Sequence, residues 1–386
     1  MNFLFVSPHF PPNYRNFCAA LKREGCTVLG LGDGKFSCFD PELKAALDWY
    51  CQVDDMHNYD ELVRACGFLT GRFGKLDRIE SLNEYWLSTD AKLRHDFNVF
   101  GVKPENIPFI RHKSEMKKIF ALCGVAHARG RLVPDLASAQ SLAAELGYPV
   151  VIKPDDGVGA NMAFRVESAA RLEELWPLTA GRHFIMEECL HGDICTFDGL
   201  TDRDGNIIFC TSHNYGQSPM DMLHYDGDIS YYSVREIPAD LEAAGRALVA
   251  GFGVKERFFH MEFFRRKDGS LCAMEVNMRP PGGMTMDMFN FACDFDLYGI
   301  WAALVAHGKA DFAWSRKYFC AYASRKDTRR YLHSHDDALA HCGMMAAYHG
   351  PMPQAFSRYM GSYGYILRSP ELPQLLEALD YLQKTV

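Results

Sequence analysis

Two glutamates stand inside apolar, strand-like segments in the later half of the chain. Glu262 lies in FFHMEFF (258–264) and Glu275 in LCAMEVN (271–277), and the dipeptide Asp268-Gly269 lies between these segments. Asp-Gly between two alternating segments is a strong signal for a β-hairpin with a two-residue turn. Such a turn places Glu262 directly opposite Glu275. The other pairs that it predicts are His260 with Asn277, Phe264 with Ala273 and Lys267 with Ser270.

The paired glutamates predict a metal site. Alternation puts His260, Glu262, Glu275 and Asn277 on one face of the hairpin. Like charges directly opposite one another are destabilising unless a positive group lies between them, and no Lys or Arg of the hairpin alternates onto this face. The all-oxygen ligand set Glu262, Glu275 and Asn277 suits Mg²⁺ or Mn²⁺ rather than zinc. The alternative is an exposed hairpin face with ordinary surface acids.

The residues after the second strand predict an anion site beside the metal. Arg279 follows Asn277 by two positions, so its side chain points along the same side if the strand continues. Its planar guanidinium could hold a carboxylate, a phosphate or a developing acyl phosphate. Pro280-Pro281 ends the strand, and Gly282-Gly283 lets the backbone approach a ligand before a helix whose first amides face an anion. Metal, arginine and helix terminus together predict phosphoryl transfer.

These side chains need a scaffold, and alternating strand and helix patterns predict its first part. Short apolar segments at 2–7, 26–32 and 76–83 are separated by helical patterns such as 59–74. This alternation is typical of a parallel sheet with crossover helices, so the first domain is expected to be a Rossmann-like, doubly wound α/β domain. The run GLGDGK at 30–35 lacks the spacing of a phosphate-binding loop and is interpreted as a turn.

The rest of the chain predicts a smaller α/β unit and then antiparallel strands. Helix and strand patterns alternate from residue 114, and Asp-Gly turns at 204–205 and 268–269 indicate hairpins. One long apolar helix is expected within 284–308, and a small mixed α/β appendage after it. The predicted fold class is therefore α/β and α+β, with a parallel-sheet domain, a small subdomain, an antiparallel-sheet domain and an appendage.

Composition limits the classes of function. The chain has 48% hydrophobic and 23% charged residues, as globular proteins do, and its net charge of −8 argues against a nucleic-acid partner. No stretch offers about 18 consecutive apolar residues, so no membrane partner is expected. The first residues, MNFLFVSPHFPPNYR, lack the features of a secretory signal. Thirteen scattered cysteines without a CxxC pair predict reduced, mostly buried thiols and a cytoplasmic protein.

Further motifs precede the hairpin in a fixed order. They are Lys113 in HKSEMKKIF, Lys153 in VVIKP, the loop DDGVGANMAF (155–164) and the segment IMEECLHGD (185–193). HMEFF (260–264) and EVNMRPPGG (275–283) complete the order. The ordered set resembles an ATP-grasp enzyme of the carboxylate–amine ligase type, a superfamily that includes biotin carboxylase, carbamoyl phosphate synthase and amino acid ligases. The fold that the resemblance implies has four parts: residues 1–110, a Rossmann-like domain; 111–190, a lid subdomain; 191–310, the catalytic subdomain; and 311–386, the appendage.

The resemblance implies a nucleotide site for ATP with Mg²⁺, or Mn²⁺. The two lysines would contact the phosphates, the loop glycines would close over them, and the 185–193 hinge would bind adenine and ribose. The residues expected in these roles are Lys113, Lys153, Gly157, Gly159, Glu187, Glu188, Cys189, Leu190 and Asp193. The metal ligands stay Glu262, Glu275 and Asn277. Arg279 is the expected catalytic residue, and the substrate would contact Arg279, Gly282, Gly283 and His260.

The reaction that the resemblance implies joins a carboxylate to an amine through an acyl phosphate, with ADP and phosphate released. An amino acid or a similar small carboxylate is the expected substrate. The alternatives are a bicarbonate-activating enzyme of the carboxylase type, a non-catalytic nucleotide-binding protein of the same fold, and a kinase. The expected partners are small molecules, and the chain is expected to be a monomer or a homodimer.

Two further interpretations stay open. The segment 212–238 contains His213, His224, Tyr231 and Tyr232, and it is either a loop over the acceptor pocket or an ordinary surface loop. His260 either orients the nucleophile or is a fully bonded core histidine.

Overall fold

The N-terminal part of the chain forms a four-stranded parallel sheet with the order β3-β2-β1-β4 in the computed structural model, which describes residues 1–157, 162–215 and 227–386. The strands are β1 (Asn2–Val6), β2 (Thr27–Gly32), β3 (Trp49–Gln52) and β4 (Arg78–Glu80). Helices α1 (Arg15–Arg23), α2 (Pro41–Ala46), α3 (Tyr59–Phe73) and α4 (Leu87–Asp96) connect and follow them, with short 3-10 turns η1 (Pro12–Tyr14) and η2 (Phe36–Cys38). The predicted Rossmann-like sheet is confirmed.

Both faces of this sheet are buried at its two central strands, which explains the uninterrupted apolar runs at 3–6 and 28–31. Phe3 and Phe5 pack on one face with Phe17 of α1, and Leu4 and Val6 pack on the other face. Trp301 from the later part of the chain lies edge-on to Phe3 and Phe17, at ring centroid distances of 5.6 and 5.0 Å. The core of the N-terminal sheet is therefore continuous with that of the following part of the molecule.

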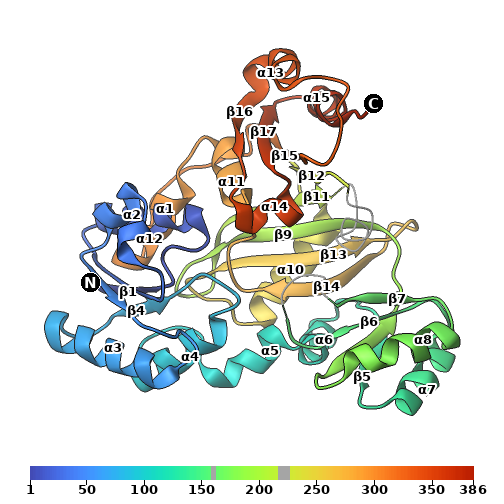
Figure 1. The fold of residues 1–386 in the computed structure, drawn as a ribbon, viewed down its shortest axis with the longest axis horizontal. Coiled ribbons are helices and arrows are strands. Elements are labelled where there is room, and N and C mark those ends of the chain that lie inside the picture. Colours follow the sequence, from blue (N-terminus) through green and yellow to red (C-terminus); the bar gives the residue numbers. More distant parts are fainter. Residues whose placement is uncertain (158–161, 216–226) are drawn as a thin grey trace.

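A second, antiparallel sheet has the order β5-β8-β6-β7. Its strands are β5 (Gly130–Val133), β6 (Val150–Pro154), β7 (Phe164–Val166) and β8 (Phe184–Glu188). Helices α7 (Leu136–Leu146) and α8 (Ala169–Leu175) and the turn η4 (Trp176–Thr179) accompany it. Figure 1 shows this small sheet and the N-terminal sheet at opposite ends of the molecule, with the largest sheet between them.

The largest sheet is antiparallel and has nine strands, in the order β14-β13-β9-β11-β12-β15-β17-β16 with β10 paired to β9. They are β9 (Asp193–Thr201), β10 (Ile207–Thr211), β11 (His213–Tyr215), β12 (Ser230–Ser233), β13 (Phe258–Arg265), β14 (Leu271–Asn277), β15 (Phe319–Arg325), β16 (Ala346–Pro351) and β17 (Tyr363–Ser369). The expected C-terminal appendage thus continues the central sheet (Figure 1).

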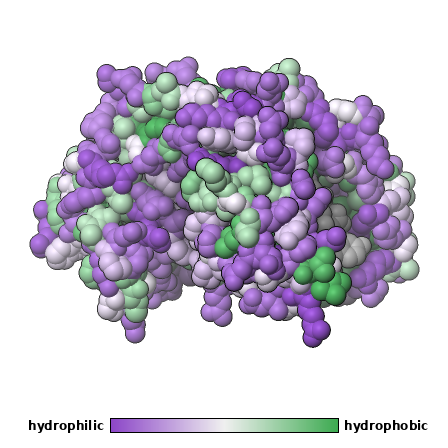
Figure 2. Space-filling model, turned by 90° about the horizontal axis from the view of Figure 1, so that it is seen from above, coloured by the Kyte–Doolittle hydropathy of each residue, from purple (hydrophilic) through white to green (hydrophobic). Residues whose placement is uncertain are grey.

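Helices cover and join these sheets. They are α5 (Ile107–Arg111), α6 (Lys113–Leu122), α10 (Ala239–Gly251), α11 (Thr285–Cys293), α12 (Leu297–His307), α13 (His335–Cys342), α14 (Gln354–Met360) and α15 (Leu372–Gln383), with η3 (Pro104–Asn106) and η5 (Gly343–Met345). No described helix is long and apolar enough to cross a membrane. The face in Figure 2 is mostly hydrophilic, with only small apolar areas.

The single long helix expected within 284–308 is two helices, so this prediction is wrong. Asp294 ends α11 with a left-handed φ of 54°, and the Asp296 carboxylate caps α12 by accepting a hydrogen bond from the Gly299 amide at 3.1 Å. Asp is favoured before a helix because its short side chain bonds the first amides, and it tolerates the left-handed conformation at a helix end better than most residues. The apolar sequence pattern therefore runs through the break between the two helices, and the two aspartates mark where that break lies.

The hairpin of β13 and β14 pairs Glu262 with Glu275 and His260 with Asn277, as predicted. The predicted two-residue turn, however, is wrong. Arg266 donates its amide to the Ser270 carbonyl at 2.9 Å, which leaves a three-residue loop, 267–269. Phe264 pairs with Cys272, not Ala273, and a β-bulge at the unpaired Met274 restores the register before Glu275. The longer loop and the bulge each shift the strand register by one residue, in opposite directions, so the two shifts cancel. A three-residue loop that ends in Gly269 (φ 84°) forms here in place of the two-residue Asp-Gly turn.

Candidate active site

The two hairpin carboxylates face each other at the edge of the central sheet. The side chains of Glu262 and Glu275 are 19% and 17% exposed. Lys113 Nζ lies 3.2 Å from Glu275 Oε1, and His260 Nε2 lies 3.1 Å from Glu262 Oε1. The lysine beside the pair comes from outside the hairpin, from α6. One oxygen of each carboxylate therefore has a partner from the chain.

The electrostatics of this pair remain incompletely balanced. Burial raises the pKa of Glu275, the charge of Lys113 lowers it in part, and the charge of Glu262 raises it further. Burial also raises the pKa of Glu262, but the hydrogen bond and charge of His260 outweigh burial, so this pKa lies below its usual value. No partner among the described residues bonds the second oxygen of either carboxylate, and an oxygen-rich pair of acids is the donor set that a divalent cation takes. The residues therefore fit Mg²⁺. In the described part of the chain, no group of three or more His, Cys, Asp or Glu side chains forms a metal cluster.

His260 belongs to a polar chain of side chains that also includes Glu262, Asp198, His213 and Thr196. Its Nδ1 lies 2.6 Å from Asp198 Oδ1, and Asp198 Oδ2 lies 2.8 Å from His213 Nδ1. Burial lowers the pKa of His260, but the charge and hydrogen bond of Asp198 and the contact with Glu262 raise it to about 9. Both ring nitrogens of His260 are bonded, which favours the fully bonded core histidine over a free catalytic base. Its substrate contact stays a prediction.

The segment 212–238, for which the sequence left two interpretations, contains the strands β11 and β12 of the central sheet. His213 is buried, and Tyr231 is buried with its hydroxyl 2.9 Å from Thr285 Oγ1. Tyr232 is half-buried, while His224 lies outside the described residues. The described part of the segment thus includes both strands and irregular chain, and its contact with an acceptor stays a prediction.

Lys113 is held by a helix cap that comes from another segment. The Asp155 carboxylate accepts hydrogen bonds from the Ser114 amide at 2.8 Å and the Ser114 hydroxyl at 2.9 Å, and the Asp155 carbonyl accepts from the Lys113 amide at 2.9 Å. An acceptor at this position satisfies the unpaired amides of the first turn of α6. Lys113 Nζ also donates to the Gly157 carbonyl at 3.3 Å. The cap therefore aims Lys113 between the small sheet and Glu275.

Lys153 lies in β6 and shares Glu187 with a second lysine. Lys153 Nζ is 2.7 Å from Glu187 Oε2, and Lys117 Nζ is 2.6 Å from Glu187 Oε1. Burial raises the pKa of Glu187, but the charges of Lys153 and Lys117 lower it to about 2. The sequence analysis missed Lys117. Its signal was the spacing of four residues from Lys113, which puts both side chains on one face of α6.

The segment after β8 joins the small sheet to the central sheet. Glu188 accepts from the Arg129 amide at 2.8 Å, and the Cys189 amide donates to the Pro149 carbonyl at 3.3 Å. Leu190 is half-buried, and Asp193 is the exposed first residue of β9. Gly159 lies outside the described residues, and the nucleotide roles of all these residues stay predictions.

Arg279 extends towards the N-terminal part of the chain. Its Nε and Nη2 donate to Glu84 Oε2 at 3.0 and 2.9 Å, Nη1 donates to the Pro280 carbonyl at 2.9 Å, and Nη2 lies 3.5 Å from Asn277 Oδ1. The sequence analysis missed Glu84, which is separated from Arg279 by 195 positions. Arg279 thus lies beside Asn277, as the strand alternation predicts.

The glycines after Arg279 differ in their surroundings. A side chain at Gly282 would meet open space, whereas one at Gly283 (φ 63°) would come within 2.5 Å of Met360 Cε. Gly283 also accepts from Asn13 Nδ2 at 3.2 Å through its carbonyl. Helix α11 begins at Thr285, close to the predicted start. Gly282 is therefore the position where a ligand could approach the backbone.

Comparisons with known proteins show which domain model and which folds the chain resembles. The model of the ATP-grasp domain matches residues 146–287. The L-arginine-specific L-amino acid ligase of Bacillus subtilis is 24% identical over 256 residues, which are 64% of this chain and 62% of that protein. The crystal structure of an L-amino acid ligase from Bacillus licheniformis matches with a TM-score of 0.76 and 15% identity, over 99% of this chain and 96% of that one.

A further solved structure with the same fold belongs to a different kind of enzyme. It is the biotin carboxylase domain of a 2-oxoglutarate carboxylase from Hydrogenobacter thermophilus, in complex with MgADP, ADP and bicarbonate. Its TM-score is 0.71 and its identity 17%, over 96% of this chain and 86% of that one. The matching model thus shows an ATP-grasp domain at residues 146–287, and the likeness to the solved structures shows that the chain shares their fold.

Proposed function

We propose that this chain is an ATP-dependent carboxylate–amine ligase. The γ-phosphate of ATP passes to a substrate carboxylate, an amine attacks the resulting acyl phosphate, and an amide, ADP and phosphate are released. The observation that carries the proposal is the continuous set of contacts that joins Lys113, the paired Glu262 and Glu275, Asn277 and Arg279. A phosphate-binding cation, a metal-binding acid pair and an anion-binding arginine are the parts that phosphoryl transfer needs.

The acid pair and Asn277 would hold the metal. When bound, Mg²⁺ neutralises charge on the phosphates as the γ-phosphoryl group moves, and Mn²⁺ could serve in the same way. Glu275 and the Gly157 carbonyl hold the Lys113 ammonium between the central sheet and the small sheet. From this position Lys113 would keep Glu275 oriented and would reach a phosphate oxygen. His260 orients Glu262 in a similar way from two positions earlier on the same strand, β13.

The nucleotide would lie between the small sheet and the central sheet. Lys153 lines this side with Lys117, and Glu187 keeps the two ammonium groups in place. Backbone groups of Glu188, Cys189 and Leu190 would read the adenine edge, and Asp193 would bind the ribose. The main role of the Glu187 carboxylate in this arrangement is to hold the two lysines, since both of its oxygens are bonded to them.

Arg279 would stabilise the oxyanion of the acyl phosphate. It lies at the end of β14 beside Asn277, and the open space at Gly282 leaves room for a ligand near the backbone. An amino acid or a similar small carboxylate is the proposed substrate, because two of the relatives are amino acid ligases. The amine acceptor is a second small molecule.

Bicarbonate activation is a second candidate, favoured by the fold shared with a biotin carboxylase domain that holds MgADP and bicarbonate. The same acid pair and arginine would then activate bicarbonate in place of an organic carboxylate. Release of ADP that depends on bicarbonate and on no organic carboxylate would identify this reaction.

Phosphate release tests the proposal. The protein is incubated with ATP and Mg²⁺ against single amino acids and pairs of amino acids, and ADP and AMP are resolved. We expect ADP and phosphate only with a particular carboxylate and amine, together with a product whose mass is that of the amide. Arg279→Ala should lose this turnover while binding ATP as the wild type does. AMP with pyrophosphate, a phosphorylated product without joining, or ATP binding without turnover would each contradict the proposal.

A further inference from the structure

A loop from the N-terminal sheet reaches the arginine of the proposed active site. This loop, residues 80–84, follows strand β4, and it ends at Glu84, whose residue surface is 6% exposed. Glu84 Oε2 alone receives both the Nε and Nη2 groups of Arg279, at 3.0 and 2.9 Å. A buried pair of this kind determines the direction of the guanidinium plane, unlike an exposed ion pair.

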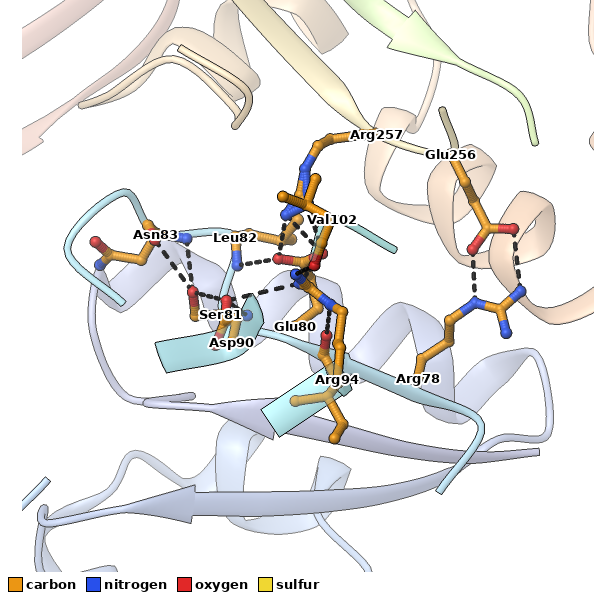
Figure 3. A network of polar contacts seen from close by, with 11 residues as sticks. Arg78, Glu80, Ser81, Leu82, Asn83, Asp90, Arg94, Val102, Glu256 and Arg257 are labelled. Atoms are coloured by element: carbon orange, nitrogen blue, oxygen red, sulfur yellow. Dashed lines mark hydrogen bonds and ion pairs between the residues drawn. The ribbon is translucent and has the colours of Figure 1, made fainter. Parts of the chain in front are cut away.

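The beginning of the loop is anchored by a buried cluster of ion pairs (Figure 3). Glu80 receives Arg257 Nη2 at 2.7 Å and Arg257 Nη1 at 2.9 Å, and Arg94 Nη2 at 2.8 Å. Arg257 immediately precedes strand β13, the strand that carries Glu262. Glu80 is therefore tied to the strand of the acid pair, and the N-terminal sheet cannot shift without straining this contact.

The middle of the loop is bonded residue by residue. The Ser81 hydroxyl donates to Asp90 Oδ2 at 2.6 Å, and the Ser81 amide donates to the same oxygen at 3.0 Å. The Tyr14 hydroxyl donates to the Leu82 carbonyl at 2.7 Å, and Leu82 has a left-handed φ of 54°. A branched-chain residue such as Leu adopts this conformation only where its surroundings hold it there. The loop is thus a rigid connection between Glu80 and Glu84.

We propose that Glu84 is a positioning residue for Arg279, held in place by the loop 80–84, so that the N-terminal sheet completes the active site. The inference rests on the proposed ligase function. With Nε and Nη2 bonded to Glu84 and one N–H of Nη1 bonded to the Pro280 carbonyl, the guanidinium has a single orientation beside Asn277, and it keeps the second N–H of Nη1 for a substrate anion. Without Glu84, the side chain could turn away from the metal ligands.

The chain offers a matched control for the ordinary effect of losing an ion pair between these parts. Glu256 receives Arg78 Nε at 2.6 Å and Arg78 Nη2 at 3.1 Å, also between the N-terminal sheet and the central part (Figure 3). Among the described residues, the bonded partners of Arg279 are Glu84, Pro280 and Asn277, and neither Arg78 nor Glu256 is one of them. Glu84→Ala and Glu256→Ala therefore remove comparable contacts, but only the first should affect the arginine.

The kinetic test compares Glu84→Ala, Glu84→Gln and Glu256→Ala with the wild type, using the substrate pair from phosphate release. We expect Glu84→Ala to lower kcat about 10²-fold with the KM for ATP changed less than about threefold. Glu84→Gln should recover most of the loss, because its carbonyl oxygen can accept the same two N–H groups. Glu256→Ala should keep the wild-type kcat. A wild-type kcat in Glu84→Ala, or equal losses in both alanine variants, would overturn the inference.

A second readout does not require turnover. The Nε–H signal of Arg279 in a nitrogen-15 spectrum, identified by its absence in Arg279→Lys, should exchange with solvent slowly in the wild type and in Glu256→Ala. It should exchange at least about tenfold faster in Glu84→Ala. Equal exchange in all three proteins would overturn the inference. Absence of any ADP from the wild type would refute the ligase proposal instead, and the exchange rates would still decide the role of Glu84.

Discussion

At the scale of single residues, the site is governed by negative charge that the chain compensates only in part. Lys113 and His260 each take one oxygen of the acid pair, and the burial of Glu275 still raises its pKa. Such an arrangement costs stability in the absence of a cation and becomes favourable when one binds. The same residues thus link metal affinity to the position of Lys113.

Glu275→Gln should abolish turnover while the protein stays folded. The substitution removes one metal-binding charge but keeps the side-chain shape, and it relieves repulsion with Glu262. We expect a loss of about 10³-fold in kcat, since a catalytic metal contributes several kcal/mol of transition-state stabilisation. Circular dichroism and a melting curve check the fold, and the exposed Glu236→Gln serves as the control. Full activity of Glu275→Gln at low Mg²⁺ would refute the metal assignment.

The ion pairs of Glu187 with its two lysines should make the stability of the protein depend on pH. Their charges lower its pKa in the folded protein to about 2, from a usual value of 4.5. The contribution is therefore fully present above about pH 4.5 and decreases as the pH falls towards 2. The melting temperature of the wild type should exceed that of Glu187→Gln by a constant amount from about pH 6 to about pH 8, and by less below about pH 4.5. A difference that grows on acidification would contradict the ion pairs.

Strand alternation and like-charge repulsion were enough to predict the acid pair, Asn277 and the place of Arg279. The spacing of Lys117 from Lys113 places both side chains on one face of α6, but only the contact with Glu187 in the structure shows which residue Lys117 binds. Glu84 could not be predicted, because its partner is 195 positions away and nothing local distinguishes it from a surface acid. A contact between residues that are far apart in the sequence leaves no signal in a local sequence pattern.

At the scale of elements, the site depends on how strands and helices begin and end. The bulge at Met274 and the loop 267–269 together bring Glu275 opposite Glu262. The cap from Asp155 starts α6 at Lys113. The sequence predicted the hairpin but not its bulge, because turn propensity alone cannot choose between loops of two and three residues. It predicted the apolar segment 284–308 as helical but missed the break at Asp294 for a similar reason.

Asp155→Ala should weaken ATP binding beyond the ordinary effect of a lost helix cap. Removing a cap costs about 1 kcal/mol of stability. Asp135→Ala is the matched control, because the Asp135 carboxylate caps α7 by accepting from the Ser138 amide at 2.7 Å, away from Lys113. Both variants should melt at somewhat lower temperatures, but only Asp155→Ala should raise the KM for ATP, by about tenfold. Identical KM values in the two variants would show that the cap does not position Lys113.

At the scale of the whole molecule, three sheets meet around the proposed site. The small sheet supplies Lys153 and Gly157, the central sheet supplies the metal ligands, and the N-terminal sheet supplies Glu84. The core around Trp301 and the cluster at Glu80 hold the N-terminal sheet to the central part. Alternating patterns predicted the kinds of sheet, whereas their mutual packing followed from contacts that no local pattern shows. The domain limits at 110, 190 and 310 remain a prediction.

Glu80→Ala should destabilise the molecule strongly. It leaves the buried guanidinium groups of Arg257 and Arg94 without their carboxylate, and breaking one partner of a buried ion pair costs about 3–5 kcal/mol. We expect a melting temperature several degrees below that of the wild type, measured by circular dichroism. The double variant Glu80→Ala with Arg257→Met should recover part of the loss, because it removes one uncompensated charge. A wild-type melting temperature of Glu80→Ala would show that the cluster does not hold the sheets together.

The measurement that tests the central claim most directly is the fate of oxygen from a labelled carboxylate. With both carboxylate oxygens of the substrate labelled with oxygen-18, attack on the γ-phosphate and later displacement by the amine should leave one labelled oxygen in the released phosphate and one in the amide. Mass spectrometry of both products reads this distribution. Unlabelled phosphate, with ADP still formed, or label in AMP would contradict activation of a carboxylate as an acyl phosphate.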